Sequence, residues 1–201
     1  MKKTDDDNLT PDEQVLRYCG IPVYYTQKPL KLDRMRFARI TASVGGKVMQ
    51  ITPDSQTAFL HELLSKIHLI GGRRFFAVGA TTDGPAMSVA AHLAKCYGTY
   101  CLTQLGELPK IRWFNVGKPN IDRQLMVEND YKLVVAANIT DSKTPDENRI
   151  KAAKDILHMY DNTTRLVVVN TSDVLAFSVK HLGIKPDAVW QFTPDQEIEV
   201  A

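Results

Sequence analysis

Short apolar runs recur through the second half of the chain and alternate with segments of helical spacing. Strands are predicted over Phe75 to Val78, Leu133 to Ala137, Arg165 to Val169 and Ala188 to Phe192. The run from Leu133 is continuous, as in a parallel strand buried on both faces. A further strand is expected at Tyr100 to Leu102, at Ile111 to Val116, or at both.

Helices are predicted before and between these strands. The segments concerned are Gln56 to Ile70, Ala86 to Tyr97, a helix opening at Thr144-Pro145 with Glu147 completing a capping box, and Ser172 to Leu182 ended by Gly183. Repeated β-α-β order predicts an α/β fold, with a parallel five-stranded sheet flanked by helices. We expect this domain to cover residues 56–201.

The N-terminal part, residues 1–55, has a different texture and is expected to be an extension of this domain. Its first dozen residues are polar and acidic, which favours partial disorder. A short helix is predicted after Thr10-Pro11. A β-hairpin is expected from Arg36 to Ser43 and Lys47 to Thr52. We expect this strand pair to lie outside the main domain.

Composition narrows the functional classes. The 25 basic and 23 acidic residues give a formal charge of +2, too small for a global field that attracts nucleic acid or membrane. Three cysteines, Cys19, Cys96 and Cys101, contain no C-x-x-C pattern, which argues against a zinc site and favours a reducing cytoplasm. No signal peptide or membrane anchor is expected.

The segment from Arg74 to Ala86 has the frame of a phosphate-binding loop. An apolar run leads to Gly79, Gly84 follows after four residues, and a predicted helix begins directly afterwards. Pro85 and Ala86 occupy the positions where such a loop carries Lys for the phosphates and Ser or Thr for Mg²⁺.

With these elements in this order, the chain from Gln56 to Phe192 resembles the AAA+ P-loop ATPase core of DnaC-type helicase loaders, in their phage or mobile-element form. The resemblance implies a three-layer core, an ATP site at the Gly79 to Gly84 loop, and a ring helicase or other replication protein as partner. We expect no counterpart of the family's lid domain, because few residues follow the fifth predicted strand.

The departures from the family pattern predict a vestigial nucleotide site. Asn138 ends the strand where the family carries its metal-binding acid, and Asp141 lies three residues further on. Asn170 matches the family's polar residue after the next strand. The vestigial site would comprise Gly79, Thr81, Thr82, Gly84, Asn138, Asp141 and Asn170. We expect no cofactor, and ATP with Mg²⁺ only if this divergent site functions.

The glycines also have a structural interpretation. A turn from strand to helix uses Gly for its backbone freedom or for close packing. Asp83 beside the predicted helix start would repel phosphate and would serve well as a helix cap.

A basic cluster in the N-terminal part is the candidate surface for nucleic acid or an acidic partner. Its members, with one further basic pair, are Lys28, Lys31, Arg34, Arg36, Arg39, Lys47, Arg73 and Arg74. A solvated hairpin edge carrying charges against aggregation is the alternative. The five histidines have no metal-ligand spacing, and no nucleophile motif is present, so neither metal nor catalytic residues are expected.

Together these features favour a non-catalytic P-loop-like interaction protein of helicase-loader type. It would dock on a partner protein and on single-stranded DNA as a second contact, with self-association as a further property. One alternative is a divergent nucleotide- or phosphate-binding enzyme, an ATPase, using the same loop. The other is a host-directed or virion-associated protein that reuses the fold.

Overall fold

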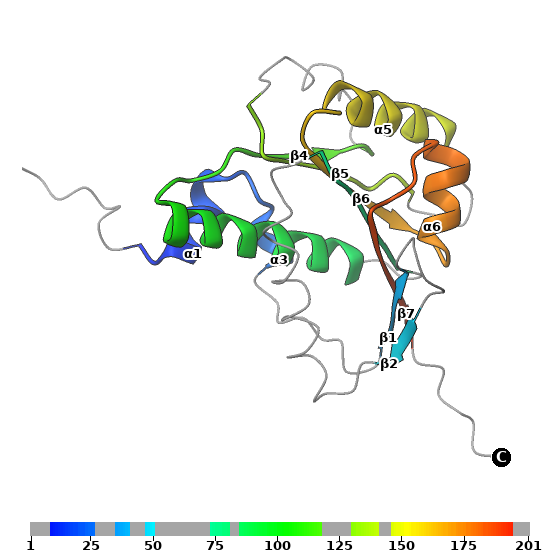
Figure 1. Cartoon of the computed structure of the whole chain (residues 1–201), viewed down its shortest axis with the longest axis horizontal. Helices are drawn as coiled ribbons and strands as arrows, with labels where there is room; N and C mark the ends of the chain where they lie inside the picture. Colours follow the sequence, from blue (N-terminus) through cyan, green and yellow to red (C-terminus); the bar gives the residue numbers. More distant parts are fainter. Residues whose placement is uncertain are drawn as a thin grey trace, which may run out of the picture.

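The computed structural model describes residues 9–26, 35–40, 47–50, 73–80, 85–117, 130–140 and 146–194. Within these ranges the molecule is a three-layer α/β structure, with helices on both faces of one sheet (Figure 1). No helix within them is long and apolar enough to cross a bilayer.

Five adjacent parallel strands, from β7 at one end to β4 at the edge, form most of the sheet, as the alternating sequence pattern predicts. They are β3 (Phe75–Ala80), β4 (Ile111–Asn115), β5 (Leu133–Ala137), β6 (Thr164–Asn170) and β7 (Ala188–Pro194). The order across the whole sheet is β2-β1-β7-β3-β6-β5-β4. The strand that leads into the glycine loop, β3, therefore lies between β6 and β7 and is paired on both sides.

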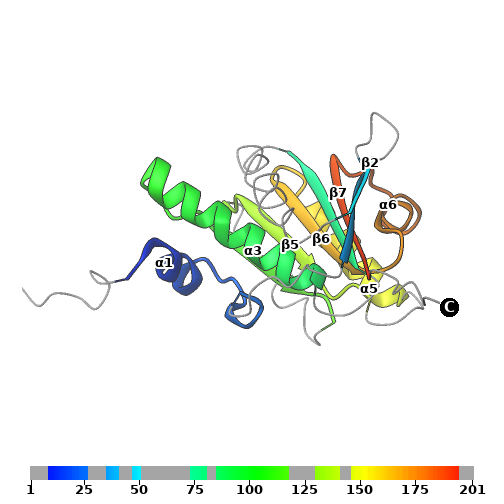
Figure 2. The same ribbon diagram turned by 90° about the horizontal axis from the view of Figure 1, so that it is seen from below.

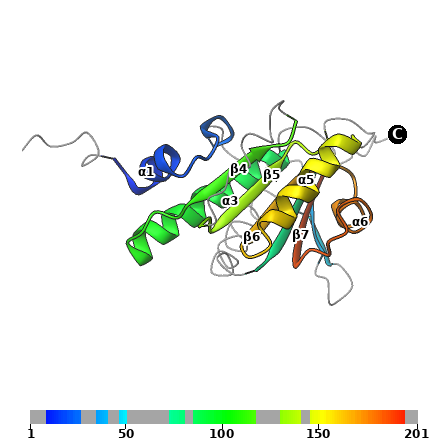
Figure 3. The same ribbon diagram turned by 90° about the horizontal axis from the view of Figure 1, so that it is seen from above.

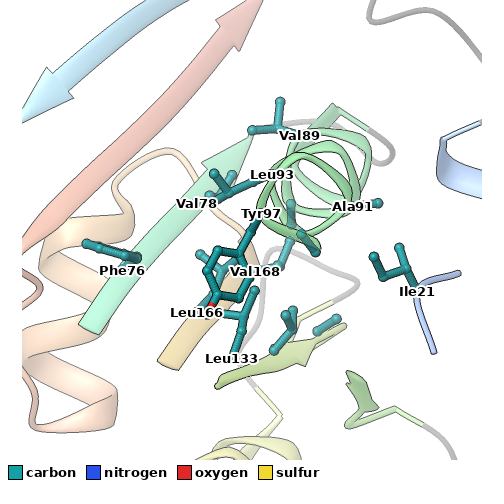
Figure 4. Close-up of a cluster of buried hydrophobic side chains, with 14 of the residues drawn as sticks. Ile21, Phe76, Val78, Val89, Ala91, Leu93, Tyr97, Leu133, Leu166 and Val168 are labelled. Carbon is teal, nitrogen blue, oxygen red and sulfur yellow. The ribbon is translucent and has the colours of Figure 1, made fainter. Parts of the chain in front are cut away.

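Helix α3 (Pro85–Tyr100) covers one face of the sheet, and α5 (Glu147–Met159) and α6 (Val174–Phe177) cover the other (Figures 2 and 3). The side chains of β3 alternate between the two layers. Phe76 and Val78 pack in the core under α3, whereas Phe75 and Ala77 pack under α5 and α6. Figure 4 shows the core under α3. Every residue of β3 is buried, and this is why its sequence reads as a continuous apolar run.

Two helices continue as π-helical turns. Helix α3 runs on into η3 (Cys101–Leu105), and α6 runs on into η4 (Ser178–Leu182). Each ends at a glycine in the left-handed region, Gly106 at φ 74° and Gly183 at φ 72°. The expected stop at Gly183 is confirmed. The candidate strand at Tyr100 to Leu102 is wrong, because these residues complete the helix.

The predicted N-terminal helix is α1 (Pro11–Tyr18), followed by the 3₁₀ turn η2 (Val23–Tyr25). The Thr10 hydroxyl accepts from the Glu13 N–H, and the Glu13 carboxylate accepts from the Thr10 N–H at 2.8 Å, a reciprocal capping box. Val15 is fully buried and belongs to the core under α3. Helix α1 therefore shares the main core.

The predicted hairpin is present as β1 (Met35–Ile40) and β2 (Lys47–Gln50), which pair antiparallel. Its expected place outside the main domain is wrong, because β1 also pairs antiparallel with β7 along six residue pairs. The physical reason is the free edge that β7 presents. Unpaired backbone N–H and C=O groups along that edge accept another strand readily.

One predicted helix begins later than expected. Helix α5 begins two residues after its expected start, because the Asp146 carboxylate accepts from the Asn148 and Arg149 N–H groups and acts as the N-cap. The expected cap Thr144 and the predicted helix Gln56 to Ile70 lie outside the described residues.

Candidate functional site

The carboxyl ends of the parallel strands define the edge where a ligand site is expected. The helix after β3 crosses one face of the sheet and the helix after β6 crosses the other, and these two strands are neighbours. Such a switch point opens a crevice in doubly wound α/β folds. Gly79, Asn138 and Asn170 all lie at this edge, as the sequence analysis expects.

Gly79 lies inside β3, where α6 approaches the strand closely. A Cβ atom built on it would be 2.6 Å from the Cβ of Val174 and 2.9 Å from Oε1 of Gln191. Real Cβ atoms essentially never come so close. This glycine therefore has a packing role that is sufficient to explain it without a phosphate, as the structural interpretation of the sequence holds.

Gln191 on β7 closes the space beside Gly79. Its Oε1 accepts from the Val174 N–H at 2.8 Å, and its Nε2 donates to the Thr171 carbonyl at 2.9 Å. The side chain is buried, with 5% exposed. One amide thus fixes the start of α6 and the end of β6 at once. Sequence reasoning missed Gln191, because one polar residue in an apolar run is also found where a strand simply nears its end.

Asn170 and Thr140 tie together the chain segments that leave β6 and β5. The Thr140 hydroxyl donates to the Asn170 carbonyl at 2.7 Å and accepts from the Asn170 N–H at 3.0 Å. The next residue, Thr171, donates its N–H to the Ala80 carbonyl at 2.8 Å. The backbone groups of this edge are therefore largely paired with each other.

Asn138 stands where the family resemblance places a metal-binding acid. Its φ of 57° is left-handed, a conformation that Asn adopts more readily than most residues. Its Nδ2 donates to Oδ1 of Asn115 at 3.0 Å, and the same oxygen accepts from the Gly117 N–H at 3.2 Å. The amide of Asn138 thus joins the ends of β5 and β4, and it brings no negative charge for a metal.

Arg149 is a basic residue at this edge that sequence reasoning did not select. Its Nη1 donates to the Asn138 carbonyl at 3.5 Å, and its Nε lies 3.5 Å from Oδ2 of Asp146. The guanidinium also covers Gly117, with Cζ 3.2 Å from the position a Cβ would take there. A cation in the first turn of a helix opposes the helix dipole. Here the Asp146 carboxylate compensates that dipole, and a phosphate would have to compete with it.

The remaining members of the vestigial site, Thr81, Thr82, Gly84 and Asp141, lie outside the described residues. Within the described ranges, no three His, Cys, Asp or Glu side chains gather in an arrangement that could hold a metal ion.

The basic residues selected from the sequence are divided over the molecule. Lys28, Lys31 and Arg34 lie outside the described residues. Arg36 and Arg39 are on β1, and Lys47 on β2 pairs with Arg39.

Arg73 and Arg74 precede β3 and are exposed at the opposite edge of the sheet from the glycine loop. Arg74 Nη1 lies 3.5 Å from Oδ1 of Asp187, whose Oδ2 accepts from the Phe75 N–H at 2.8 Å. The charge of Arg74 is therefore partly neutralised by a structural ion pair with Asp187.

Exposed apolar side chains occur on α1, on η2 and on the chain from the end of α3 to residue 108. Six of the eight large exposed hydrophobic residues in the described ranges occur there, and we call them the corner patch: Tyr18, Val23, Tyr24, Tyr100, Leu105 and Leu108. Tyr18 is 51% exposed and Tyr24 63%. Figures 1 and 2 show α1 beside the end of α3. Exposed apolar surface on this scale commonly marks a protein interaction site.

The corner patch stands on a rigid support. Gly98 of α3 allows α1 to approach, because a Cβ there would collide with Cγ1 of Val15. Lys95 Nζ contacts Oδ2 of Asp12 at 2.8 Å, and the Thr99 hydroxyl donates to Oδ1 of Asp12 at 2.7 Å. The hydrogen bond from Lys95 is the main reason why the pKa of Asp12 is lowered.

Thiols beneath the patch are protected. The pKa of the Cys19 thiol is raised to about 11, mainly by burial and to a smaller extent by the nearby Cys101. Sequence reasoning placed neither residue in a site, and the structure gives both a packing role in the core under α3.

A scan against protein-family models finds no match to the chain, and a search of curated proteins finds no relative.

Proposed function

We propose that this protein is a non-catalytic interaction protein with a P-loop-like frame, a DNA replication accessory of helicase-loader type. Its mechanism is docking on a partner protein, with single-stranded DNA as a second contact. The observation that carries the proposal is the corner patch, which exposes tyrosine and aliphatic side chains on α1, on η2 and around η3.

Two features of the carboxyl edge support the absence of turnover. Asn138 and Arg149 hydrogen-bond within the protein, and Gly79 is explained by the close approach of Val174. At position 85, Pro has no N–H and no charge to offer a phosphate. The polar groups of this edge therefore hold strands and helices together.

The first experiment is affinity capture with the full chain as bait. Tyr18→Ser with Tyr24→Ser should lose a replicative helicase that the unaltered chain retains, because these side chains supply the largest exposed aromatic surface of the patch. Val179→Ser is the matched control, since Val179 is 52% exposed but lies on η4. Equal capture by all three baits, or no capture of any replication protein, contradicts the proposal.

A divergent nucleotide-binding enzyme is the second candidate, favoured by the switch point between β3 and β6. It predicts a rise in melting temperature with ATP or ADP concentration, because a ligand that binds only the folded state stabilises it. The docking proposal predicts no shift at millimolar nucleotide.

Binding of single-stranded DNA has its own readout. Fluorescence anisotropy of labelled oligothymidylate should rise with protein concentration, and the affinity should fall steeply with salt. A combined Arg36→Ser, Arg39→Ser and Lys47→Ser variant should bind more weakly than a Lys132→Ser control, because the three residues share one hairpin. Unchanged binding would remove the hairpin from the proposal.

A further inference from the structure

Two of the three cysteines are buried together at the end of α1. Cys19 is the C-cap residue of α1, and Cys101 is the first residue of η3, directly after α3. They are 3% and 4% exposed, and both belong to the core under α3. The third cysteine, Cys96 on α3, is only partly buried. The function proposed above uses none of these thiols.

The contacts of α1 with α3 fix how the two helices lie against each other. Helix α1 contacts both α3 and η3. In its first turn, Asp12 lies between Lys95 and Thr99 and contacts both side chains. About one turn further on, Val15 packs against Gly98 so closely that a Cβ atom on the glycine would collide with it. The start of α1 is therefore held against the last turns of α3.

The end of α1 lies over the start of β4. The Cys19 N–H donates to the Val15 carbonyl at 2.9 Å, so Cys19 lies one turn beyond Val15 on the same side of the helix. Gly20 follows directly, and a Cβ atom there would be 3.7 Å from the carbonyl oxygen of Ile111, the first residue of β4. This contact places the Cys19 thiol near the amino ends of the strands.

Cys101 lies in the same region. It is three residues beyond Gly98, so both are on one face of their helix. The charge of Lys132, directly before β5, acts on the Cys101 thiol, and β5 is paired with β4 from its first residue. Both thiols therefore lie over the same end of the β4–β5 pair. Their proximity agrees with the effect of Cys101 on the pKa of Cys19.

Cys96 is excluded from this pair by helix geometry. It is five residues before Cys101 on one helix, a rise of about 7.5 Å, and cysteines whose Cα atoms are more than about 7 Å apart cannot be bridged. The Cys96 thiol is influenced by Asp12 at the start of α1, about 10 Å along the helix from Cys19. Cys96 thus faces the start of α1, and Cys101 faces its end.

The two paired thiols differ in their surroundings. Burial raises the pKa of Cys101, but a hydrogen bond with the Tyr97 hydroxyl and the charge of Lys132 act in the opposite direction. For Cys19 both causes, burial and the neighbouring Cys101, raise the pKa. The thiolate is the reactive form of a cysteine. Cys101 is therefore the thiol that reacts first with an oxidant.

We propose that Cys19 and Cys101 form a redox pair that peroxide closes to a disulfide, which fixes the end of α1 to η3. The Cys101 thiolate attacks one peroxide oxygen, the O–O bond breaks, and the leaving hydroxide takes up the thiol proton, giving water and a sulfenic acid. The Cys19 sulfur then attacks the Cys101 sulfur, the S–O bond breaks, and a second water leaves with the Cys19 proton. Two thiols are oxidised and one peroxide is reduced to two waters. Because both sulfurs are buried, peroxide reaches them when α1 opens locally.

The disulfide joins two parts of the corner patch. Tyr18 directly precedes Cys19, and Tyr100 directly precedes Cys101. Oxidation therefore holds these two exposed tyrosines in one arrangement. The bond also closes a loop of about 80 residues, which restricts the unfolded chain and stabilises the folded state. Formation of the disulfide does not depend on the docking proposal.

Mass spectrometry of the full chain tests the pairing. The reduced protein is treated with millimolar hydrogen peroxide, blocked with N-ethylmaleimide and digested. The folded chain should lose two hydrogen atoms and yield a peptide pair in which Cys19 is joined to Cys101, and dithiothreitol should reverse both changes. Cys96→Ser is the matched control and should behave in the same way. Cys19→Ala and Cys101→Ala should form no bond within the chain.

Oxidation in concentrated urea shows whether the fold selects the pair. In the unfolded chain the bond between Cys96 and Cys101 should prevail, because the shorter loop closes more readily. In the folded chain the bond between Cys19 and Cys101 should prevail. This comparison uses the unaltered sequence, so it does not depend on whether a core variant folds.

Stability and trapping give two further readouts. Oxidised Cys96→Ser should melt about 5–15 °C above its reduced form, and dithiothreitol should abolish the difference. Dimedone, which traps sulfenic acids, should label Cys101 in Cys19→Ala several-fold faster than Cys19 in Cys101→Ala, because Cys101 is the attacking thiol. Equal labelling would overturn the assigned roles.

Four outcomes overturn the redox pair itself. They are a folded chain that keeps both hydrogen atoms, a bond to Cys96 in the folded chain, disulfides only between two copies, and equal melting temperatures of the oxidised and reduced forms. Addition of oxygen atoms to Cys101 without any disulfide would equally contradict it, because a resolving thiol within reach prevents that reaction.

Discussion

Replacing Gly79 with Ala tests whether close packing explains the glycine of the phosphate-loop frame. The new methyl group would meet the Cβ of Val174, which no rotamer change can move, and Oε1 of Gln191. Overpacking of a core costs about 1–3 kcal/mol. Displacing Gln191 would also strain its buried bond to the Val174 N–H, at a cost of about 1–3 kcal/mol when such a group loses its partner. Gly79→Ala should therefore destabilise the fold by about 2–5 kcal/mol.

Thermal or urea unfolding followed by circular dichroism measures this loss. For a chain of this size about 1 kcal/mol corresponds to 2–4 °C, so the melting temperature should fall by about 4–20 °C. Gly117→Ala is the matched control, because its methyl group would meet only the end of the Arg149 side chain, at 3.2 Å. Both substitutions reduce the conformational entropy of the unfolded chain equally, and this effect alone stabilises the folded state by about 0.4–1 kcal/mol in each variant. If Gly79→Ala is as stable as Gly117→Ala, close packing is refuted as the reason for Gly79.

Three further predictions concern the core and the support of α1. Val15→Ala should lower the free energy of unfolding by about 1.5–3 kcal/mol in urea, because the Val15 side chain is fully buried. It should also speed the labelling of Cys19 by iodoacetamide. In the folded protein the pKa of Cys19, about 11, leaves little reactive thiolate at pH 8. Gln191→Leu should cost about 2–4 kcal/mol by the same measurement, since it strands a backbone donor and a backbone acceptor in the core, and an unchanged midpoint would contradict the bridging role. The lowered pKa of Asp12 means that its pair with Lys95 stabilises the fold above the ordinary value of 3.8 and ceases to do so as pH falls through the lower folded value. Asp12→Asn should therefore cost less than about 1 kcal/mol of stability at pH 6, seen as a slightly lower melting temperature, and the difference from the unaltered chain should shrink as pH falls below 3.8.

Local signals account for the parts of the fold that the sequence predicts well. The runs at Phe75 and Leu133 are strands because both faces of the sheet are covered, and that condition requires continuous apolar sequence. The start of α1 at Thr10 and the stop at Gly183 follow from side chains and φ angles of the residues themselves. Such features need no knowledge of distant parts of the chain.

Long-range contacts account for the errors. The place of β1 in the main sheet depends on an open edge of β7, about 150 residues further along the chain. The segment from Tyr100 to Leu102 contains a tyrosine, as a strand often does, but it belongs to a helix. Helix α3 continues through the π-helical turn η3 and stops only at Gly106. Gln191 is decisive for α6 only through its contacts with Thr171 and Val174, which no periodicity reveals.

The candidate site was likewise predicted only in part from the sequence. That Gly79, Asn138 and Asn170 share one edge follows from parallel strands alone, and the sequence predicts it. The use of the Asn138 amide by Asn115 and the position of Arg149 over Gly117 depend on how the edge closes in three dimensions. The corner patch was equally hidden, since Tyr18 and Leu105 are distant in sequence.

The position of β3 between β6 and β7 has a consequence for synthesis on the ribosome. Its nearer partner in sequence begins at Thr164, 84 residues after β3 ends at Ala80. At about 5–20 residues per second, the central strand waits about 4–17 s with both edges unpaired. Throughout that interval an entirely apolar strand is available to chaperones or to neighbouring nascent chains. The yield of the protein in a cell should therefore depend on translation rate and chaperone supply as much as on the stability of the finished fold.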